Sequence, residues 1–134
     1  MSNAPIAMGD VFALGEHRLL VGDSLNAESV RQFLRDESID LILTDPPFGV
    51  SYVEGKKAFG GGTALHHDAI RNDHAQSDSE YRAFTKAWLD AARPFLARKN
   101  SLYCFGSDKM IFALRDGLLD AGFRFGQLLI WLKP

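Results

Sequence analysis

Four consecutive residues, Asp45-Pro46-Pro47-Phe48, bring together the groups needed to hold a planar base. Each proline fixes its own φ, lacks an N–H group and keeps the preceding residue extended, so the carbonyls of Asp45 and Pro46 are expected to point outward unpaired. The Asp45 carboxylate only accepts hydrogen bonds, and Phe48 offers a flat aromatic face. Residues 45–48, which we call the shelf, therefore suit a base with an exocyclic amine. The oxygens would accept from the NH2 group and the base would stack on the ring.

Methylation of such an amine is the chemistry that the shelf favours. The nitrogen lone pair is delocalised into the base ring, so the flat amine is a weak nucleophile. Hydrogen bonds from its two N–H groups to fixed acceptors favour the pyramidal form and free the lone pair to attack a methyl donor. An alternative stays open, because Asp45 and Phe48 are also typical of an ordinary turn that ends a strand.

The segments around the shelf alternate between strand and helix patterns. The apolar run Ile39–Thr44 (IDLILT), broken only by Asp40, predicts a strand that is buried on both faces. Further strands are expected at residues 18–22, 102–105 and 125–132, with a short strand or turn at residues 11–14.

Three helices are expected between these strands. The first covers residues 27–35, and the second follows the capping box Ser77–Glu80 until Pro94 ends or kinks it. Ser107 caps the third, which ends near Gly122. Apolar side chains at helical spacing mark the buried faces of the second and third helices: Tyr81, Phe84, Trp88, Ala91 and Phe95, then Met110, Ile111, Leu114 and Leu118.

This alternation predicts one α/β domain with a mainly parallel sheet flanked by helices. In such sheets ligands bind at the carboxyl ends of the strands. Three segments fall at predicted carboxyl ends, namely Gly22-Asp23-Ser24, the shelf and Gly106-Ser107. We therefore expect the ligand site at that end of the sheet.

The shelf and its surroundings resemble the amino-methyltransferases of DNA, which transfer a methyl group from S-adenosylmethionine to adenine N6 or cytosine N4. The order of the matching segments is that of the permuted subgroup, in which the catalytic motif precedes the cofactor glycine motif. The resemblance covers the chain beyond Phe12 and implies a partial Rossmann-like methyltransferase fold. It rests on HRLLVGDSL (17–25), IDLILTDPPFGV (39–50), IRND (70–73), SLYCFGSDK (101–109) and LLIWLKP (128–134).

The resemblance also implies roles for individual residues. The four shelf residues would be catalytic, and Asp rather than Ser at the first motif position favours adenine N6 over cytosine N4. Asp23 would accept from the adenine amine of the cofactor. The implied cofactor site also includes Ser24, Asp45 and Pro46. The residues alone leave a second interpretation open, because Ser24 or Asn26 is also a suitable cap for the helix at residues 27–35.

Two parts of the family pattern do not occur in this sequence. One is the glycine motif Phe-x-Gly-x-Gly, for which Gly60-Gly61-Gly62 is no substitute because no apolar strand precedes it. The other is the acidic residue for the cofactor ribose. The resemblance therefore implies a single, truncated catalytic domain over residues 1–134, without the two family strands that lie between residues 18–22 and 39–44.

Two hypotheses about activity follow from this departure. The first is a DNA methyltransferase that acts on adenine N6. The alternative is an inactive or split fragment that works only as an oligomer or with a missing half. In both cases the unpaired apolar edge of the strand at 39–44 predicts a homodimer. A related enzyme of RNA or of protein amides is disfavoured, because such enzymes usually have Asn in place of Asp45.

Composition bounds the partners and the location. The formal net charge is −2 and the pI is about 6.0, so this piece alone is expected to bind DNA weakly, because phosphate binding needs clustered Lys and Arg. The single Cys104 excludes an internal disulfide, fits a reducing cytoplasm and is interpreted as a small buried side chain. The sequence contains neither an apolar run of transmembrane length nor a signal-peptide pattern, so we expect a cytoplasmic protein without membrane contact.

Residues 50–76 show no sustained periodicity and are expected to form a mobile loop. Lys56 and Lys57 near Phe59 are suited to contact DNA, although a solvated segment is favoured. Asn72-Asp73 is open to two interpretations, a turn before the capping box or a site near the cofactor or target base. The segment also contains side chains of the kinds that bind metals, namely His66, His67, Asp68 and His74. Their spacing matches no standard zinc site, so we expect no metal there.

Overall fold

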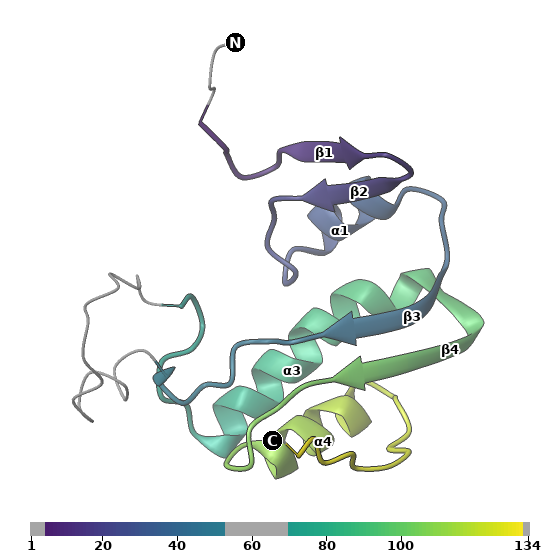
Figure 1. The fold of residues 1–134 in the computed structure, drawn as a ribbon. Coiled ribbons are helices and arrows are strands. Elements are labelled where there is room, and N and C mark those ends of the chain that lie inside the picture. Colours follow the sequence, from purple (N-terminus) through teal and green to yellow (C-terminus); the bar gives the residue numbers. More distant parts are fainter. Residues whose placement is uncertain (1–4, 53–69, 133–134) are drawn as a thin grey trace. The chain divides into compact units, whose positions relative to one another are not determined.

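The computed structural model describes residues 5–52 and 70–132 and is of mixed α/β class (Figure 1). It divides into two compact units. The first consists of Met1–Leu43 with Ala87–Tyr103, and the second of Thr44–Lys86 with Cys104–Pro134. Among the described residues, none of the helices has the length and apolar character that crossing a membrane requires.

The first unit begins with an antiparallel hairpin of β1 (Val11–Leu14) and β2 (His17–Leu20). Gly15 takes a φ of 67° in the connecting turn, a conformation that costs glycine little. The short strand at 11–14 is confirmed. The expected strand at 18–22 begins one residue earlier, ends at Leu20 and pairs with β1. The prediction that it joins a parallel sheet is therefore wrong for the described residues, because a two-residue turn returns it directly to its neighbour in sequence.

Helix α1 (Ala27–Leu34) confirms the first expected helix. Asn26 caps it, since its side-chain oxygen accepts from the N–H groups of Glu28 and Ser29 at 3.1 and 3.0 Å. The hairpin and the segment after α1 are joined by Arg18. Its guanidinium lies 5.3 Å from the centre of the Phe33 ring and donates to Glu37 at 2.9 Å.

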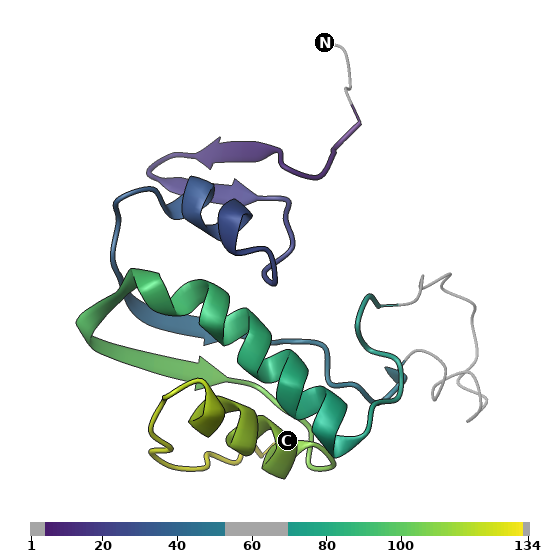
Figure 2. The same ribbon diagram turned by 180° about the vertical axis from the view of Figure 1, so that it is seen from behind.

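Strands β3 (Ile39–Thr44) and β4 (Leu96–Cys104) form the second sheet, and their arrows run in the same direction in Figure 1. Helix α3 (Asp78–Ala92) lies along one face of this sheet in both views, and its Trp88 and Leu89 are buried (Figures 1 and 2). The expectation that β3 is buried on both faces is wrong. Leu41 and Leu43 are 52% and 67% exposed, because no described element covers the face on which they lie.

The capping box of α3 is confirmed in both directions. The Ser77 N–H donates to the Glu80 carboxylate at 2.8 Å, and the Glu80 N–H donates back to the Ser77 hydroxyl at 3.4 Å. The helix gives way to a 3-10 turn, Arg93–Phe95, whose second residue is Pro94. The proline therefore ends the helix as the sequence predicts.

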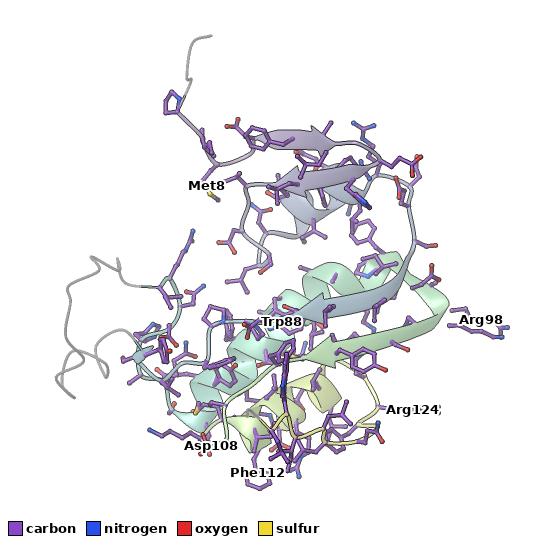
Figure 3. The ribbon with its side chains drawn as sticks, viewed as in Figure 1. Met8, Trp88, Arg98, Asp108, Phe112 and Arg124 are labelled. Carbon is purple, nitrogen blue, oxygen red and sulfur yellow. The ribbon has the colours of Figure 1, made fainter. Side chains whose placement is uncertain are left out.

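The core of the second unit lies between α3 and α4 (Ile111–Asp120), which run side by side in Figures 1 and 2. Gly117 lets the helices approach closely, since a Cβ there would lie 2.6 Å from the Thr85 Cβ. Arg82 spans the same contact and donates to both carboxylate oxygens of Asp120, at 2.5 and 2.8 Å. On the outer side of α4, Phe112 projects into solvent (Figure 3). The buried members of this core are Tyr81, Met110, Ala113 and Leu114.

The expected strand at residues 125–132 is not formed. These residues are irregular and exposed, with Ile130 and Leu132 exposed to 77% and 83%. A strand needs a neighbour to pair its N–H and C=O groups, and none of the described strands is placed beside this segment. Its recorded ring contact joins Trp131 to Phe105, with the ring centres 6.2 Å apart.

Candidate active site around Asp45

The shelf follows β3 directly, at the point where β4 also ends. The Phe105 N–H donates to the Thr44 carbonyl at 2.9 Å, so the residue before Asp45 is attached to the residue after β4. The carboxyl ends of the two strands therefore meet, as the sequence predicts for a parallel pair. Gly106 follows at once, and it packs tightly, because a Cβ there would lie 2.8 Å from Leu114.

The shelf residues differ in their exposure to solvent. Asp45 is exposed, whereas Pro46, Pro47 and Phe48 are half-buried. Within the described part of the chain, no hydrogen bond engages the Asp45 carboxylate or the Pro46 carbonyl. Among the described residues, the lone pairs of these two groups are therefore left to accept from a ligand. The proline rings restrict the backbone that carries them.

The negative charge of Asp45 affects the pKa values of two neighbouring side chains. Burial raises the pKa of the Cys104 thiol to about 12, and the negative charge of Asp45 adds to the effect. Burial likewise raises the pKa of the Tyr81 phenol, with further contributions from Cys104, Asp73 and Asp45. Both groups therefore favour their protonated forms at neutral pH. Cys104 was expected to be a small buried side chain; it is half-buried and packs against the core around Tyr81.

The chain leaves the shelf through Gly49, which is buried and has a φ of 66°. A Cβ at this position would lie 3.0 Å from the Tyr81 ring and 3.3 Å from Gln76. Glycine is therefore required twice, for its backbone conformation and for its close packing. The sequence pattern places Tyr81 on the buried face of the second helix and does not single out Gly49. A glycine immediately after the aromatic residue of the shelf was the pattern that could have indicated this turn.

Asp73 is buried to 4% exposure and contacts the residues that follow Gly49. Its carboxylate accepts from the N–H groups of Val50 and Tyr52 at 3.3 and 2.7 Å, and its carbonyl accepts from the Ser51 N–H at 2.6 Å. The sequence left this residue open between a turn and a site. The structure shows that it attaches the end of the shelf to the segment before α3.

Asp23 and Ser24 belong to the first unit and open helix α1. The half-buried Asp23 accepts from the Leu25 N–H at 3.0 Å through its carboxylate and from the Asn26 N–H at 3.0 Å through its carbonyl, while Ser24 is exposed. This is a turn that leads into the Asn26 cap, so the capping role falls to Asn26. The cofactor role of Asp23 and Ser24 stays a prediction.

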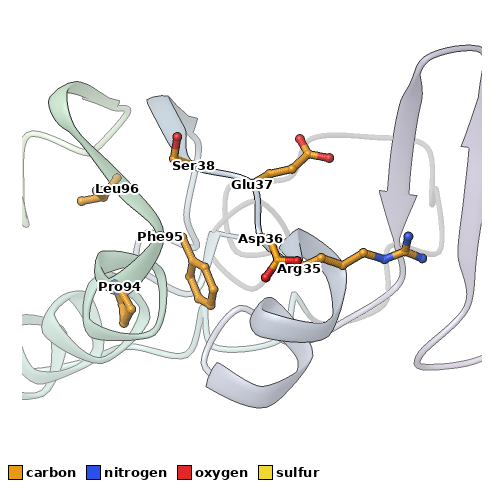
Figure 4. Close-up of a pocket in the computed structure, with 7 residues that line it drawn as sticks. All are labelled: Arg35, Asp36, Glu37, Ser38, Pro94, Phe95 and Leu96. Carbon is orange, nitrogen blue, oxygen red and sulfur yellow. The ribbon is translucent and has the colours of Figure 1, made fainter.

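A shallow pocket of about 270 Å³ lies in the first unit, where β3 and β4 begin (Figure 4). Arg35, Asp36, Glu37 and Ser38 line one side, and Pro94, Phe95 and Leu96 line the other. None of the predicted site residues contributes to it, so the pocket does not mark the predicted chemistry.

The remaining predictions for residues 50–76 fall mostly on positions 53–69, which lie outside the described residues. They include the lysines and Phe59 as candidate DNA contacts and the pair His66-His67. Within residues 5–52 and 70–132, no group of three or more His, Cys, Asp or Glu side chains is placed to hold a metal ion.

Comparison with known proteins gives two kinds of match. A family model described as DNA methylase matches residues 39–134. The Type II methyltransferase M2.LlaDCHI of Lactococcus lactis subsp. cremoris is 28% identical over 100 residues, which cover 75% of this chain and 36% of that protein. The Type II methyltransferase M2.DpnII of Streptococcus pneumoniae is 27% identical over 100 residues, which cover 75% of this chain and 37% of that protein. No solved structure matches.

The chain thus spans a little over a third of the length of these two relatives. The family match begins at the first residue of β3 and includes the shelf, the Asp73 segment, β4 and α4. The matched region therefore includes both the shelf, which follows β3, and the segments that contact the shelf. On these grounds the chain belongs to the DNA amino-methyltransferase family.

Proposed function

We propose that this protein contributes the amine-binding part of a methyltransferase that modifies adenine N6 in DNA, with S-adenosylmethionine as the methyl donor. The observation that carries the proposal is the Asp45 carboxylate. It is exposed, follows directly on a strand end that is fixed by a hydrogen bond to the neighbouring strand, and has no hydrogen bond among the described residues.

The shelf would act by positioning and by accepting hydrogen bonds. Asp45 and the Pro46 carbonyl accept from the two N–H groups of the target amine, and Phe48 stacks on a base that has left the duplex. These bonds strengthen as the nitrogen becomes pyramidal and positively charged, so they stabilise the transition state more than the bound substrate. The proposed transfer needs no covalent step at Cys104 or Tyr81.

The types of the acceptor residues support the proposed cofactor. S-adenosylmethionine supplies a methyl group on a cationic sulfur together with an adenine amine, and both parts favour carboxylate or carbonyl oxygens. Asp45 and Pro46 provide such oxygens after β3, and Asp23 provides a carboxylate beside Ser24 at the start of α1. The cofactor roles of Asp45 and Pro46 and those of Asp23 and Ser24 are proposed separately, from the resemblance of each segment to the family. The preference for adenine rests on Asp rather than Ser at position 45.

The first prediction tests the central acceptor. Asp45→Ala should lower methyl transfer about 100-fold or more, because an interaction that is strongest in the transition state is lost. Asp40→Ala removes another exposed carboxylate, from within β3, and should leave transfer nearly unchanged. Each variant would be produced in a bacterial host without adenine methylation, and N6-methyladenine in the host DNA measured by mass spectrometry. Equal methylation by the Asp45→Ala variant and the parent would contradict the role of Asp45.

A second candidate is a split or inactive fragment that needs a second chain, and the exposed apolar side chains favour it. Leu43, Ile130 and Leu132 are 67%, 77% and 83% exposed in the isolated chain. Titration calorimetry with S-adenosylmethionine separates the two candidates. Heat of binding to the purified chain supports the enzyme, whereas binding that appears only after a second chain is added supports the split form.

A further inference from the structure

Three successive backbone N–H groups after the shelf converge on one residue. Those of Val50 and Tyr52 donate to the two carboxylate oxygens of Asp73, and that of Ser51 donates to its carbonyl. Ser51 has a φ of 52°, and this unusual conformation turns the neighbouring N–H groups toward the same point. Such a run of N–H groups forms a concave site for an anion, and here the anion is a side chain of the same protein.

The opposite segment reinforces this arrangement. The Ala75 N–H donates to the Ser51 hydroxyl at 2.8 Å, and the Gln76 N–H donates to the Gly49 carbonyl at 3.0 Å. The Gln76 side chain donates to the Asn72 carbonyl at 2.8 Å, which steadies the turn that presents Asp73. We call residues 49–52 together with residues 72–76 the clamp.

We propose that Asp73 is a positioning residue, which fixes the end of the shelf and so determines where Phe48 and the Asp45 acceptors lie. The start of the shelf is attached through Thr44 to Phe105, and the prolines stiffen its middle. Its end is attached through the hydrogen bonds of the clamp, and Asp73 is the buried charge at the centre of the clamp. This role rests on the proposed function of the shelf.

The consequence for catalysis follows from geometry. An acceptor works on the target amine only when it stays within hydrogen-bond reach, and a displacement of about 1 Å can cost about 100-fold in rate. Without the Asp73 carboxylate, two N–H groups lose their partners and the end of the shelf is free to shift. Asp73 does not touch the reacting atoms in this account; it acts through residues 49–52.

Asp73→Asn is the sharpest variant, because it keeps the size of the side chain and one acceptor oxygen. The amide nitrogen that replaces the second oxygen cannot accept from an N–H group. Asp78→Asn is the matched control, since it makes the same change at an exposed position five residues further along the chain. Should Asp73→Asn fail to fold, Ser51→Ala opens the clamp from its exposed side by removing the bond to Ala75.

Two measurements on the same proteins test the proposal. Nuclear magnetic resonance should show amide exchange at Val50 and Tyr52 at least about 10-fold faster in Asp73→Asn, with shifted signals of the Phe48 ring. Leu89 and Leu114 should keep their protection. Methyl transfer should lose about 10- to 100-fold in kcat. Asp78→Asn should change neither quantity.

The outcomes separate the two proposals. Unchanged Phe48 signals in a folded Asp73→Asn variant overturn the positioning role, and so does unchanged kcat in an active protein. No transfer by the parent protein counts against the proposed function, but the exchange rates and the Phe48 signals still decide whether Asp73 fixes the shelf.

Discussion

At the level of single residues, the shelf separates two tasks. Asp45 presents an exposed charge, and Phe48 presents a half-buried ring just before the chain turns at Gly49. This division makes the contribution of each residue measurable by itself.

Phe48 should contribute binding of the target base rather than chemistry. Phe48→Ala should weaken that binding by about 1–3 kcal/mol, the usual worth of one stacked base, whereas Phe48→Tyr should bind like the parent. The fluorescence of 2-aminopurine at the target position reports the unstacked base. An undiminished signal with Phe48→Ala would show that the ring does not stack.

Cys104 should be unreactive in the folded protein. Its pKa is raised to about 12, by burial first and by Asp45 second. At pH 8 the native thiol should therefore react with a disulfide reagent at least about 100-fold more slowly than in urea, where its pKa returns to about 8.5. Asp45→Asn should speed the native reaction, because it removes the nearby negative charge. Equal native and unfolded rates would mean that the thiol is not shielded.

The sign of the accompanying stability change follows from the same shift. The folded pKa of Cys104 lies above the unfolded one, so the protonated thiol favours the folded state at neutral pH. This contribution is complete below about pH 8.5 and is lost as the pH rises toward 12.

At the level of elements, the first two helices could be predicted, whereas the third begins at Ile111 after Met110 and is not capped by Ser107 as expected. The sheet could be predicted only in part. The capping box Ser77–Glu80 and the stop at Pro94 are confirmed because their partners lie within one turn in the sequence. The strand at Ile39–Thr44 is also confirmed in its bounds. Information about these elements is local, so it can be read from short patterns.

The failures share a physical cause, which is dependence on distant partners. Residues 125–132 have the apolar content of a strand but no described neighbour to pair with, and β3 lacks a cover on the face of Leu41. The candidate site divides in the same way. The shelf was predicted from four adjacent residues, whereas the clamp was missed because Asp73 meets Val50 across 23 positions.

The contact between α3 and α4 should be sensitive to one methyl group. Gly117→Ala would place its Cβ 2.6 Å from the Thr85 Cβ and 2.7 Å from the Arg82 carbonyl, which is backbone and cannot rotate away. The clash should cost about 1–3 kcal/mol, more than the roughly 1 kcal/mol that alanine returns in helix propensity. Gly126→Ala, with nothing within 4 Å of the added Cβ, is the control. Urea unfolding measures both, and equal midpoints would contradict the close contact.

At the level of the whole molecule, apolar surface is the feature that most needs explanation. The exposed apolar side chains of residues 128–132 are consecutive: Leu128, Leu129, Ile130, Trp131 and Leu132. A contiguous stretch of this kind typically marks an interaction site. The predicted homodimer therefore remains our proposal for the isolated chain.

Light scattering at micromolar concentration should give the mass of a dimer. Ile130→Lys should shift the chain toward the monomer, because it places a charge in the apolar stretch. Gln127→Lys adds the same charge nearby without removing apolar surface and should leave the mass unchanged. A monomer mass for the parent chain would refute the dimer.

The hydrogen bonds of Asp73 also bear on how such a protein can change over time. They join positions 21 and 23 residues apart, so both ends of the intervening segment are fixed to each other whatever its sequence. The entropy of closing a loop grows only with the logarithm of its length, and doubling the length costs about 0.6 kcal/mol. Insertions and deletions at this point are therefore cheap in stability. A lineage can therefore vary the number of residues between Tyr52 and Asp73 while the hydrogen bonds of Asp73 keep residues 50–52 in place.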